Sequence, residues 1–198
     1  ENPDYWMDYK SAEFCIQIIE KTLCHQQGES LDGTPMRGKP FILQPFHKFC
    51  IYNLVGFKLK DTQIVKYHEA LIYIPRKNTK STFAAALAWA LSILRRKSGA
   101  KCYVASAALM QSLESFNFRK YNINRMGENQ KDGGSIKIID NNNEHSIESS
   151  MDDGSFFIRA LAANPDAQDS LNCNIAIADD IHAFKQPKQY NLFKEAMK

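Results

Sequence analysis

The sequence contains no apolar run long enough to cross a membrane. The apolar segment at residues 83–94 falls well short of the roughly 20 residues that a spanning helix needs, and charged residues flank it. A secretory signal pattern is missing as well. These two absences predict a soluble, intracellular protein.

Cysteine pairs with the spacing of metal ligands are also missing. The five cysteines are odd in number and scattered, and three of them lie within apolar segments. Such cysteines are typical of reduced, buried thiols in a cytosolic protein, so a disulfide framework or a structural zinc site is not expected.

The sequence also lacks a strong excess of positive or negative charge. The formal net charge is only +3, which does not by itself indicate a nucleic-acid surface but permits a local basic patch. Hydrophobic residues at 44% and charged residues at 24% are ordinary for a soluble globular protein. At 198 residues the chain can build one sizeable core, or one domain with a small appendage.

The most informative stretch is residues 70–96, where an apolar run, a basic turn and an Ala-rich segment follow one another. The run Leu71–Ile74 predicts a short buried strand, and Pro75 ends it because proline has no amide hydrogen to donate to a ladder. A long apolar helix is predicted from Lys80 onward. This order of strand, polar turn and helix is suited to binding phosphate.

The physical reason lies in the start of the predicted helix. A helix N-terminus presents unpaired amide hydrogens and a partial positive charge, which stabilise a phosphate. Lys80 would add a charge toward the β and γ phosphates, and the Ser81 hydroxyl would take one position on a bound magnesium ion. Arg76 and Lys77 would strengthen the positive field on the same turn.

The usual phosphate-loop pattern, G-x-x-x-x-G-K-[ST], is not fully met. Ile74 stands at the first glycine position and Thr79 at the second, directly before Lys80. Because Thr79 is β-branched, it should resist the positive φ that glycine adopts without cost, and a different loop conformation could result. The same residues fit an ordinary strand, turn and helix with a solvated basic turn equally well.

Two helices are predicted ahead of this stretch. Residues 5–26 carry apolar residues at a helical spacing, and a loop rich in Gly, Ser, Asp and Pro follows at residues 28–39. The apolar positions are Phe14, Ile18, Ile19 and Leu23. We therefore expect an N-terminal helical arm and loop at residues 1–39 and the main domain at residues 40–198.

The second helix should open at Pro45 and stop near Gly56. Its aromatic edge is suited to cover a flat heterocycle such as adenine. An amphipathic helix that simply packs on a sheet fits the same pattern.

Strand and helix patterns alternate downstream. Strands are predicted at residues 101–105 and 155–161, a helix at 107–118, and a hairpin whose Asn-rich turn lies at 140–143. This alternation predicts a parallel sheet with crossover helices.

A second diagnostic stretch ends on two acids. Residues 175–178 read as a buried strand, and Asp179 and Asp180 follow it directly. Two adjacent carboxylates at this position are costly to desolvate without a cation, and ligand sites of open α/β sheets lie at these strand ends. A magnesium ion bound to a nucleotide would supply that cation. Acids that cap a helix after the strand are the alternative.

These segments together resemble the ATPase domain of tailed-bacteriophage large terminase subunits, the DNA-packaging motors. Four matches carry the resemblance: an adenine-side motif FILQPFHKFCIYNLVGF, a variant Walker A motif IYIPRKNTKST, a following strand and helix YVASAALMQSLESF, and a Walker B region DSLNCNIAIADDIHAFK. The family usually has R-K-N-G-K-[ST] in the Walker A motif and D-E-x-H-A after the Walker B strand. The matches cover residues 40–187 in the family's order.

The resemblance implies an ASCE-type P-loop NTPase fold. This is an α/β three-layer sandwich with a mainly parallel central sheet, here truncated after the Walker B strand and without the family's nuclease domain. It implies an ATP hydrolase that uses ATP and Mg²⁺ to drive packaging of double-stranded DNA into the procapsid of a bacteriophage or prophage.

The resemblance also implies the partners and the location. Double-stranded DNA, the portal protein and the small terminase subunit would be partners, and no membrane would be involved. The protein would be a monomer in isolation and a homo-oligomeric ring on the procapsid. It would act in the host bacterial cytoplasm, at the procapsid portal during packaging.

Residue roles follow from the same resemblance. Lys80 and Ser81 would hold phosphate and magnesium, Arg76 would sense the γ phosphate, and His47 stands where a glutamine usually reads adenine. The full nucleotide-binding set would be Phe46, His47, Arg76, Lys77, Asn78, Thr79, Lys80, Ser81 and Thr82.

On the acidic side, Asp179 would orient magnesium through water, and Asp180 stands where the family has its catalytic glutamate. Because aspartate is one methylene shorter than glutamate, its carboxylate lies farther from the attacking water. A general base needs its oxygen within about 2.6–3.2 Å of the water oxygen. We therefore predict weak nucleotide affinity and low ATPase activity for this chain alone. A trans-acting arginine from a neighbouring subunit would complete the site, with Arg119, Arg125 and Arg159 as candidates.

Two alternatives stay open. One is a catalytically weak or inactive assembly module in which the altered loop serves only for docking. The other is a helicase-like ATPase of the same broad fold.

Overall fold

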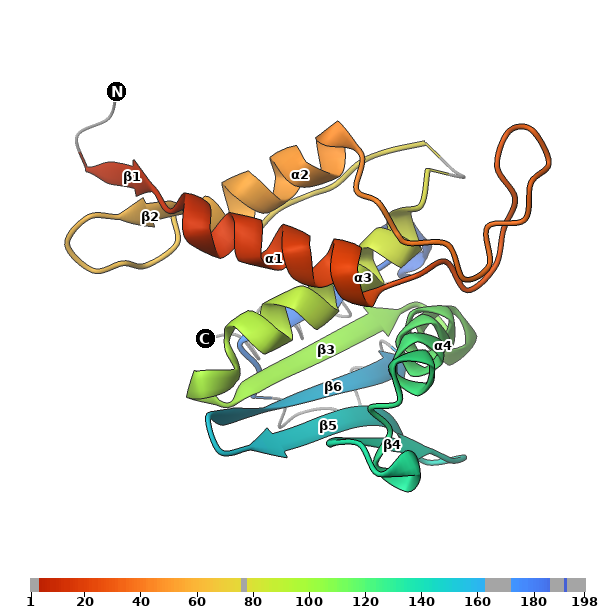
Figure 1. The fold of residues 1–198 in the computed structure, drawn as a ribbon. Coiled ribbons are helices and arrows are strands. Elements are labelled where there is room, and N and C mark those ends of the chain that lie inside the picture. Colours follow the sequence, from red (N-terminus) through yellow and green to blue (C-terminus); the bar gives the residue numbers. More distant parts are fainter. Residues whose placement is uncertain (1–3, 76–77, 163–171, 186–190, 192–198) are drawn as a thin grey trace. The chain divides into compact units, whose positions relative to one another are not determined.

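A computed structural model of the chain describes residues 4–75, 78–162, 172–185 and 191. The chain divides into two compact units, Glu1–Phe83 and Ala84–Lys198, and each has its own architecture (Figure 1). Residues 1–39, expected to form a separate arm, share the first unit with residues 40–83. A domain boundary at residue 39 stays a prediction.

The first unit is mainly helical. Two short strands, β1 (Tyr5–Met7) and β2 (Phe57–Leu59), form an antiparallel pair. Between them lie α1 (Tyr9–Thr22), α2 (Pro45–Ile51) and a π-helical turn at Tyr52–Gly56. The predicted helix start at Pro45 and stop at Gly56 are both confirmed, although the last turn before Gly56 is wider than an α-helical one.

The N-terminal helix α1 is confirmed, but it begins at Tyr9 and its buried face matches the predicted one only in part: Ile19 is completely buried, and Leu23, directly after the helix, is 1% exposed. Phe14 is 40% exposed, whereas Ala12 and Cys15 are completely buried. The helix packs against α2 and the π-helical turn. The buried face combines two small side chains, Ala12 and Cys15, with two large ones, Ile16 and Ile19.

An ion pair connects the start of α1 to β2. The Asp8 carboxylate accepts from the Ser11 backbone N–H at 3.2 Å, which caps α1, and from Lys58 Nζ at 2.5 Å. Burial by itself would raise the pKa of the Asp8 carboxyl, but the hydrogen bonds from Lys58 and Ser11 lower it to about 2.

The predicted buried strand at Leu71–Ile74 is wrong. These residues form no strand, and Leu71 and Tyr73 remain 74% and 93% exposed. An apolar run becomes a strand only when a neighbour pairs with its backbone, and no described residue forms a ladder with this segment.

The second unit is an α/β sandwich. The division between the units falls inside helix α3 (Lys80–Leu94). The other elements of this unit are β3 (Ala100–Ser106), α4 (Leu109–Met126), β4 (Ile136–Asp140), β5 (His145–Met151), β6 (Gly154–Ala162) and β7 (Ile175–Ala178).

These strands form one mostly parallel sheet in the order β4-β5-β6-β3-β7. Strand β3 pairs in parallel with both β6 and β7, and β5 is antiparallel to β6 and to β4. The α/β class and the mainly parallel sheet predicted from the sequence are therefore confirmed, as is the hairpin.

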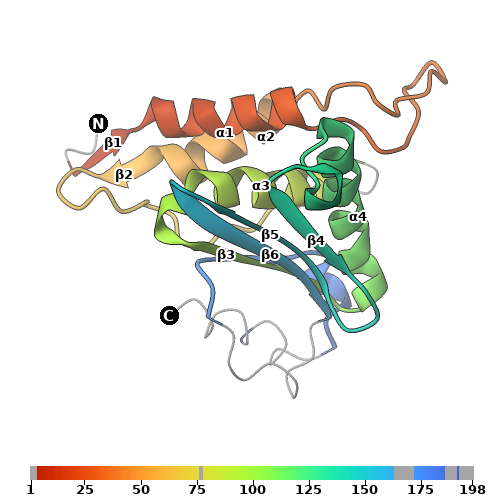
Figure 2. The ribbon, with the colours of Figure 1, turned by 60° about the horizontal axis from the view of Figure 1, so that its bottom comes forward.

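Both faces of the sheet are apolar. Helices α3 and α4 cover one face (Figure 2), where Trp89 of α3 packs edge-on against Phe156 of β6 with ring centroids 5.6 Å apart. Alternation along the strands puts Tyr103, Ala105 and Leu161 on the opposite face, where they form a second buried cluster with Cys173.

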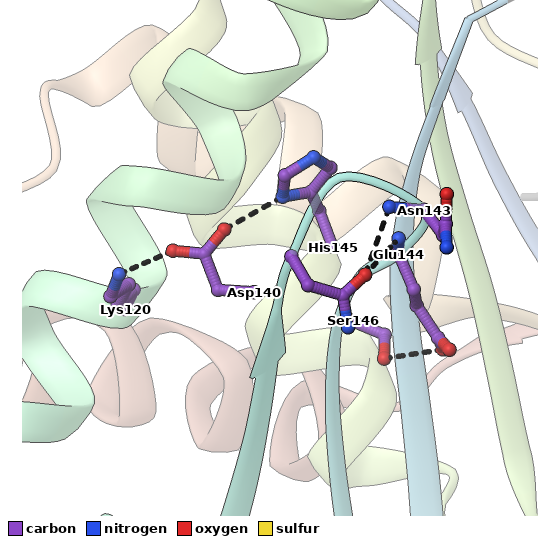
Figure 3. A network of polar contacts seen from close by, with 7 residues as sticks. Lys120, Asp140, Asn143, Glu144, His145 and Ser146 are labelled. Carbon is purple, nitrogen blue, oxygen red and sulfur yellow. Dashed lines mark hydrogen bonds and ion pairs between the residues drawn. The ribbon is translucent and has the colours of Figure 1, made fainter.

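Polar contacts hold the β4–β5 hairpin to α4 (Figure 3). Asp140, at the end of β4, accepts from Lys120 of α4 and lies 2.7 Å from His145 Nδ1 of β5. In the turn, Asn141 Oδ1 accepts from the backbone N–H groups of Asn143 and Glu144, each at 2.9 Å. The Asn-rich turn is thus an Asx-type turn, as its composition predicts.

The described residues bear on three features that the sequence lacks: disulfides, metal-binding clusters and membrane-spanning helices. All five cysteines are free, and four of them are buried. In the ranges that the structure describes, no three His, Cys, Asp or Glu side chains gather into a metal-binding group. Across those same ranges, no helix has the length and apolar character that a bilayer span would require.

Candidate functional site

The candidate phosphate loop lies in the first unit, directly before α3. Helix α3 begins at Lys80, as predicted, so the backbone N–H groups of Lys80, Ser81 and Thr82 belong to its first turn. The Asn78 side chain donates to the Pro75 carbonyl at 3.3 Å. Arg76 and Lys77 lie outside the described residues.

Thr79 adopts the backbone conformation of the glycine that it replaces. Its φ is +55°, in the left-handed region, so the expectation that threonine would resist positive φ is not met. For a residue with a Cβ this conformation costs on the order of 1–3 kcal/mol, and a β-branched side chain is disfavoured most.

His47 of α2 contacts Thr79 directly. His47 is 1% exposed, and its ring packs against the rings of Phe46 and Phe83, at centroid distances of 3.9 and 4.4 Å. Its Nδ1 accepts from the Gln44 backbone N–H at 3.1 Å, and its Nε2 lies 3.3 Å from Thr79 Oγ1. Burial lowers the pKa of His47 to about 4, so the imidazole is neutral at physiological pH.

The aromatic edge predicted for α2 is present at the surface. Phe46 and Phe49 are 38% and 68% exposed, although both are large apolar side chains. Phe46 belongs to the proposed adenine side, and its ring packs against that of His47. A flat ring exposed next to the phosphate loop is suited to stack on a base.

The candidate acid pair lies in the second unit, at the carboxyl end of β7. The Asp179 backbone N–H donates to the Ala105 carbonyl at 2.8 Å, so Asp179 continues the ladder with β3, and the residue is 7% exposed. Asp179 Oδ1 accepts from the Asp180 backbone N–H at 3.0 Å. The strand and the two acids after it were predicted from the sequence.

Asp180 has a φ of +53°, which is also left-handed. Only three described residues other than glycine have positive φ, namely Gln63, Thr79 and Asp180. Two of these three stand at the positions where the sequence departs from the family motifs. Backbone strain of this kind is concentrated at functional sites in proteins, so its position supports a functional role for both turns.

Ser106 is a residue of this region that sequence analysis missed. It ends β3, and the register that pairs Ala105 with Ala178 puts Ser106 beside Asp179 on the same face of the sheet. Its hydroxyl is fully buried and has no hydrogen-bond partner among the described residues. A buried hydroxyl without a partner is costly. The signal in the sequence was a serine that closes a buried strand.

The candidate arginines differ in their exposure. Arg119 is only 1% exposed and donates to Ser115 Oγ at 2.8 Å, so it cannot extend to a neighbouring subunit. Burial lowers its pKa to about 10, which leaves it charged at neutral pH. Arg125 is exposed near the end of α4, and Arg159 is half-buried on β6. Arg125 is therefore the candidate best able to reach a partner.

The family model for "Terminase large subunit, ATPase domain" matches residues 45–198, well over half of the chain and both candidate motifs. The chain belongs to this family. The resemblance inferred from the four motifs is thus confirmed.

Among solved structures, the fold of this terminase ATPase domain is similar to the crystal structure of the HK97 bacteriophage large terminase. The TM-score is 0.65 at 19% sequence identity, and the match covers 96% of this chain and 35% of that chain. The chain thus spans about a third of the length of that terminase, and at this identity the likeness concerns the fold. No curated protein sequence matches the chain.

Proposed function

We propose that this chain is the ATP-hydrolysing motor domain of a terminase large subunit, which uses ATP and Mg²⁺ to package double-stranded DNA into a procapsid. One observation carries the proposal. In a segment that the terminase ATPase family model matches, a residue in the glycine-like left-handed conformation immediately precedes a long helix that begins with Lys80 and Ser81.

The phosphate side is built on the start of α3. The amide groups of its first turn would bind the β and γ phosphates, and Lys80 would add a point charge to them. Asn78, Thr79 and Thr82 would line the loop. Arg76 and Lys77 are proposed from the family motif, with Arg76 near the γ phosphate.

The magnesium side needs few protein ligands. Mg²⁺ at a nucleotide usually keeps several waters and is bound through one or two carboxylates together with the phosphates. Ser81 and Asp179, which are proposed from the family motif, are oxygen ligands of the type that Mg²⁺ prefers. Among the described residues, no larger group of metal-binding side chains is present. The bound ion would neutralise charge on the β and γ phosphates.

The catalytic base would be Asp180. Its carboxylate would accept a proton from the attacking water, but it is one methylene shorter than glutamate, so we expect slow turnover. On the adenine side, Phe46 would stack on the base. His47 is the other adenine-side residue proposed from the family motif, at the position where the family usually has glutamine.

The proposed partners follow from the family. They are double-stranded DNA, the portal protein and the small terminase subunit, with a ring of copies on the procapsid and a monomer in isolation. The proposed location is the host bacterial cytoplasm. Membership in a terminase family favours packaging over the helicase-like alternative.

Comparing the chain with its Lys80→Ala variant tests the proposed nucleotide role. We expect the unchanged chain to hydrolyse ATP slowly with Mg²⁺, and Lys80→Ala to lose both hydrolysis and most of the affinity. Lys131→Ala is a matched control because Lys131 is also a lysine but is exposed in a different unit. Equal ATP binding by the unchanged chain and Lys80→Ala would refute the proposal.

That result would favour the assembly module instead. One observation supports this second candidate: Leu71 and Tyr73, just before the loop, are large apolar residues with most of their surface exposed. In this alternative the segment would contact another protein of the packaging machinery.

A further inference from the structure

Two positions that differ from the family pattern contact each other directly. His47 replaces the family's adenine-side glutamine, and Thr79 replaces its loop glycine. The two residues are 32 positions apart in the sequence, yet His47 Nε2 lies 3.3 Å from Thr79 Oγ1. Both belong to the first unit, so this contact is internal to that unit.

The direction of each hydrogen bond follows from its neighbours. The Gln44 backbone N–H can only donate, so His47 Nδ1 must accept from it and the ring proton lies on Nε2. Nε2–H then donates to Thr79 Oγ1, and the Thr79 hydroxyl donates to the Asn78 carbonyl at 2.7 Å. The three bonds form a continuous chain from the start of α2 to the turn before α3.

The ring of His47 is also held in place by packing. It contacts the rings of Phe46 and of Phe83, which lies in the first turn of α3. The imidazole thus contacts the helix that follows the loop and hydrogen-bonds the residue that precedes Lys80. With both nitrogens engaged and 1% of its surface exposed, His47 has little polar capacity left for a base.

We propose that His47 is a positioning residue. It holds Thr79 in the left-handed conformation, so that His47 and Thr79 together provide the backbone conformation that the loop glycine provides in the family motif. The effect on nucleotide binding rests on the function proposed above, whereas the effect on loop conformation does not. In this arrangement His47 acts on the phosphates through Thr79 and the turn before Lys80.

The first test measures the tautomer without nucleotide. Imidazole nitrogen shifts of the ¹⁵N-labelled chain at pH 7 should show His47 protonated at Nε2 and unprotonated at Nδ1. In Thr79→Ala the shift of the Nε2 proton should change, because its acceptor is gone. A proton on Nδ1, or no change in Thr79→Ala, would overturn the proposal.

The second test is a double-mutant cycle on unfolding in urea. Thr79→Ala and His47→Leu should be coupled, with the unfolding equilibrium constants departing from additivity by about ten-fold. The control pairs Thr79→Ala with His25→Leu. His25 is a half-buried histidine of the same unit that packs on Phe41 and makes its backbone hydrogen bonds with Gly38 and Lys39, so this control cycle should be additive. Additivity in the His47 cycle would overturn the proposal.

The third test uses an N-methylanthraniloyl derivative of ATP with Mg²⁺ as a fluorescent probe. Thr79→Ala should weaken binding about ten-fold, the loss expected from one hydrogen bond and the released turn. Thr79→Ser, which keeps the hydroxyl, should restore affinity to within about two-fold of the unchanged chain.

The decisive background is Thr79→Gly, in which the loop needs no support. There, His47→Leu should weaken probe binding much less than it does when Thr79 is present. If His47→Leu weakened binding equally in both backgrounds, His47 would contact the nucleotide itself and the positioning role would be overturned. If no variant bound the probe, including the unchanged chain, the proposed function would fail, and the first two tests would still decide the pairing.

Discussion

Two short apolar runs in this chain have opposite outcomes. Leu71–Ile74 and Ile175–Ala178 each contain four residues, and each leads into a candidate functional turn. The second run forms β7, paired along its length with β3, whereas the first forms no strand and leaves Tyr73 93% exposed. Sequence patterns treat the two runs alike. The difference shows that a ladder partner, rather than apolar composition, makes a strand.

The turns that follow the two runs are alike in strain but differ in support. Thr79 and Asp180 both have left-handed backbones. Thr79 contacts a side chain from a distant helix, whereas Asp180 is supported by its own neighbour, since its backbone N–H donates to Asp179 Oδ1 at 3.0 Å. One turn therefore depends on tertiary structure and the other on local sequence.

The largest expected effect separates the two runs directly. Ile175→Ala should lower the free energy of unfolding by about 2–4 kcal/mol, because Ile175 is 5% exposed and its removal leaves a cavity in the sheet. Leu71→Ala, the matched change in the exposed run, should alter it by less than about 0.5 kcal/mol. Urea unfolding measures both. A large loss from Leu71→Ala would show that the run is buried in solution.

The next effect concerns the carboxylate after β7. Asp180→Glu restores the side-chain length of the family motif, so ATP turnover should rise about ten-fold, equivalent to about 1.4 kcal/mol of barrier. Steady-state phosphate release measures this, with Asp180→Asn as the variant that should abolish turnover. A rate unchanged by both substitutions would remove Asp180 from the catalytic role.

A smaller effect compares the strain in the two turns. Asp180→Gly should stabilise the chain by about 1 kcal/mol, because glycine adopts the left-handed conformation without a Cβ penalty. Thr79→Gly should stabilise it less, since the His47 Nε2–H then loses its acceptor. The thermal or urea midpoints of the two variants measure the difference. Equal gains would indicate that the His47 contact adds nothing to the stability.

The smallest effect is a pH dependence located in the unit that holds the exposed run. Asp8 has a folded pKa of about 2 against an ordinary value of 3.8. Because the folded pKa is depressed, its contribution is fully present above the unfolded pKa and is lost as pH falls from about 4 toward 2.

With allowance for solvent screening, the contribution of Asp8 is on the order of 0.5–1 kcal/mol. Urea unfolding at pH 6 and pH 3 should show a smaller acid loss in Lys58→Met, which lacks the partner cation. Lys137→Met, which removes an exposed ion pair with Glu148 in the other unit, is the control. An identical acid loss in the unchanged chain and Lys58→Met would contradict the assignment.

Much of the fold was predictable because its signals are local. Pro45 opens α2, Lys80 opens α3, and the Asn-rich turn joins β4 to β5, all as composition and spacing predicted. The acids after β7 were also predictable, since a buried strand that ends on two carboxylates is a local pattern. The exposure of Phe14 on α1 was not, because it depends on which side of the helix meets a packing partner and not on the apolar character of the residue.

The sequence by itself determined where α2 and α3 begin, which strand carries the acids, and which family the motifs resemble. Tertiary structure alone decided that residues 71–74 are unpaired, that Ser106 lies buried beside Asp179, and that His47 contacts Thr79. The physical reason is the distance along the chain over which each kind of interaction acts. Capping, proline and turn preferences act over a few residues, whereas strand pairing and the support of a strained backbone require groups that the chain brings together only on folding.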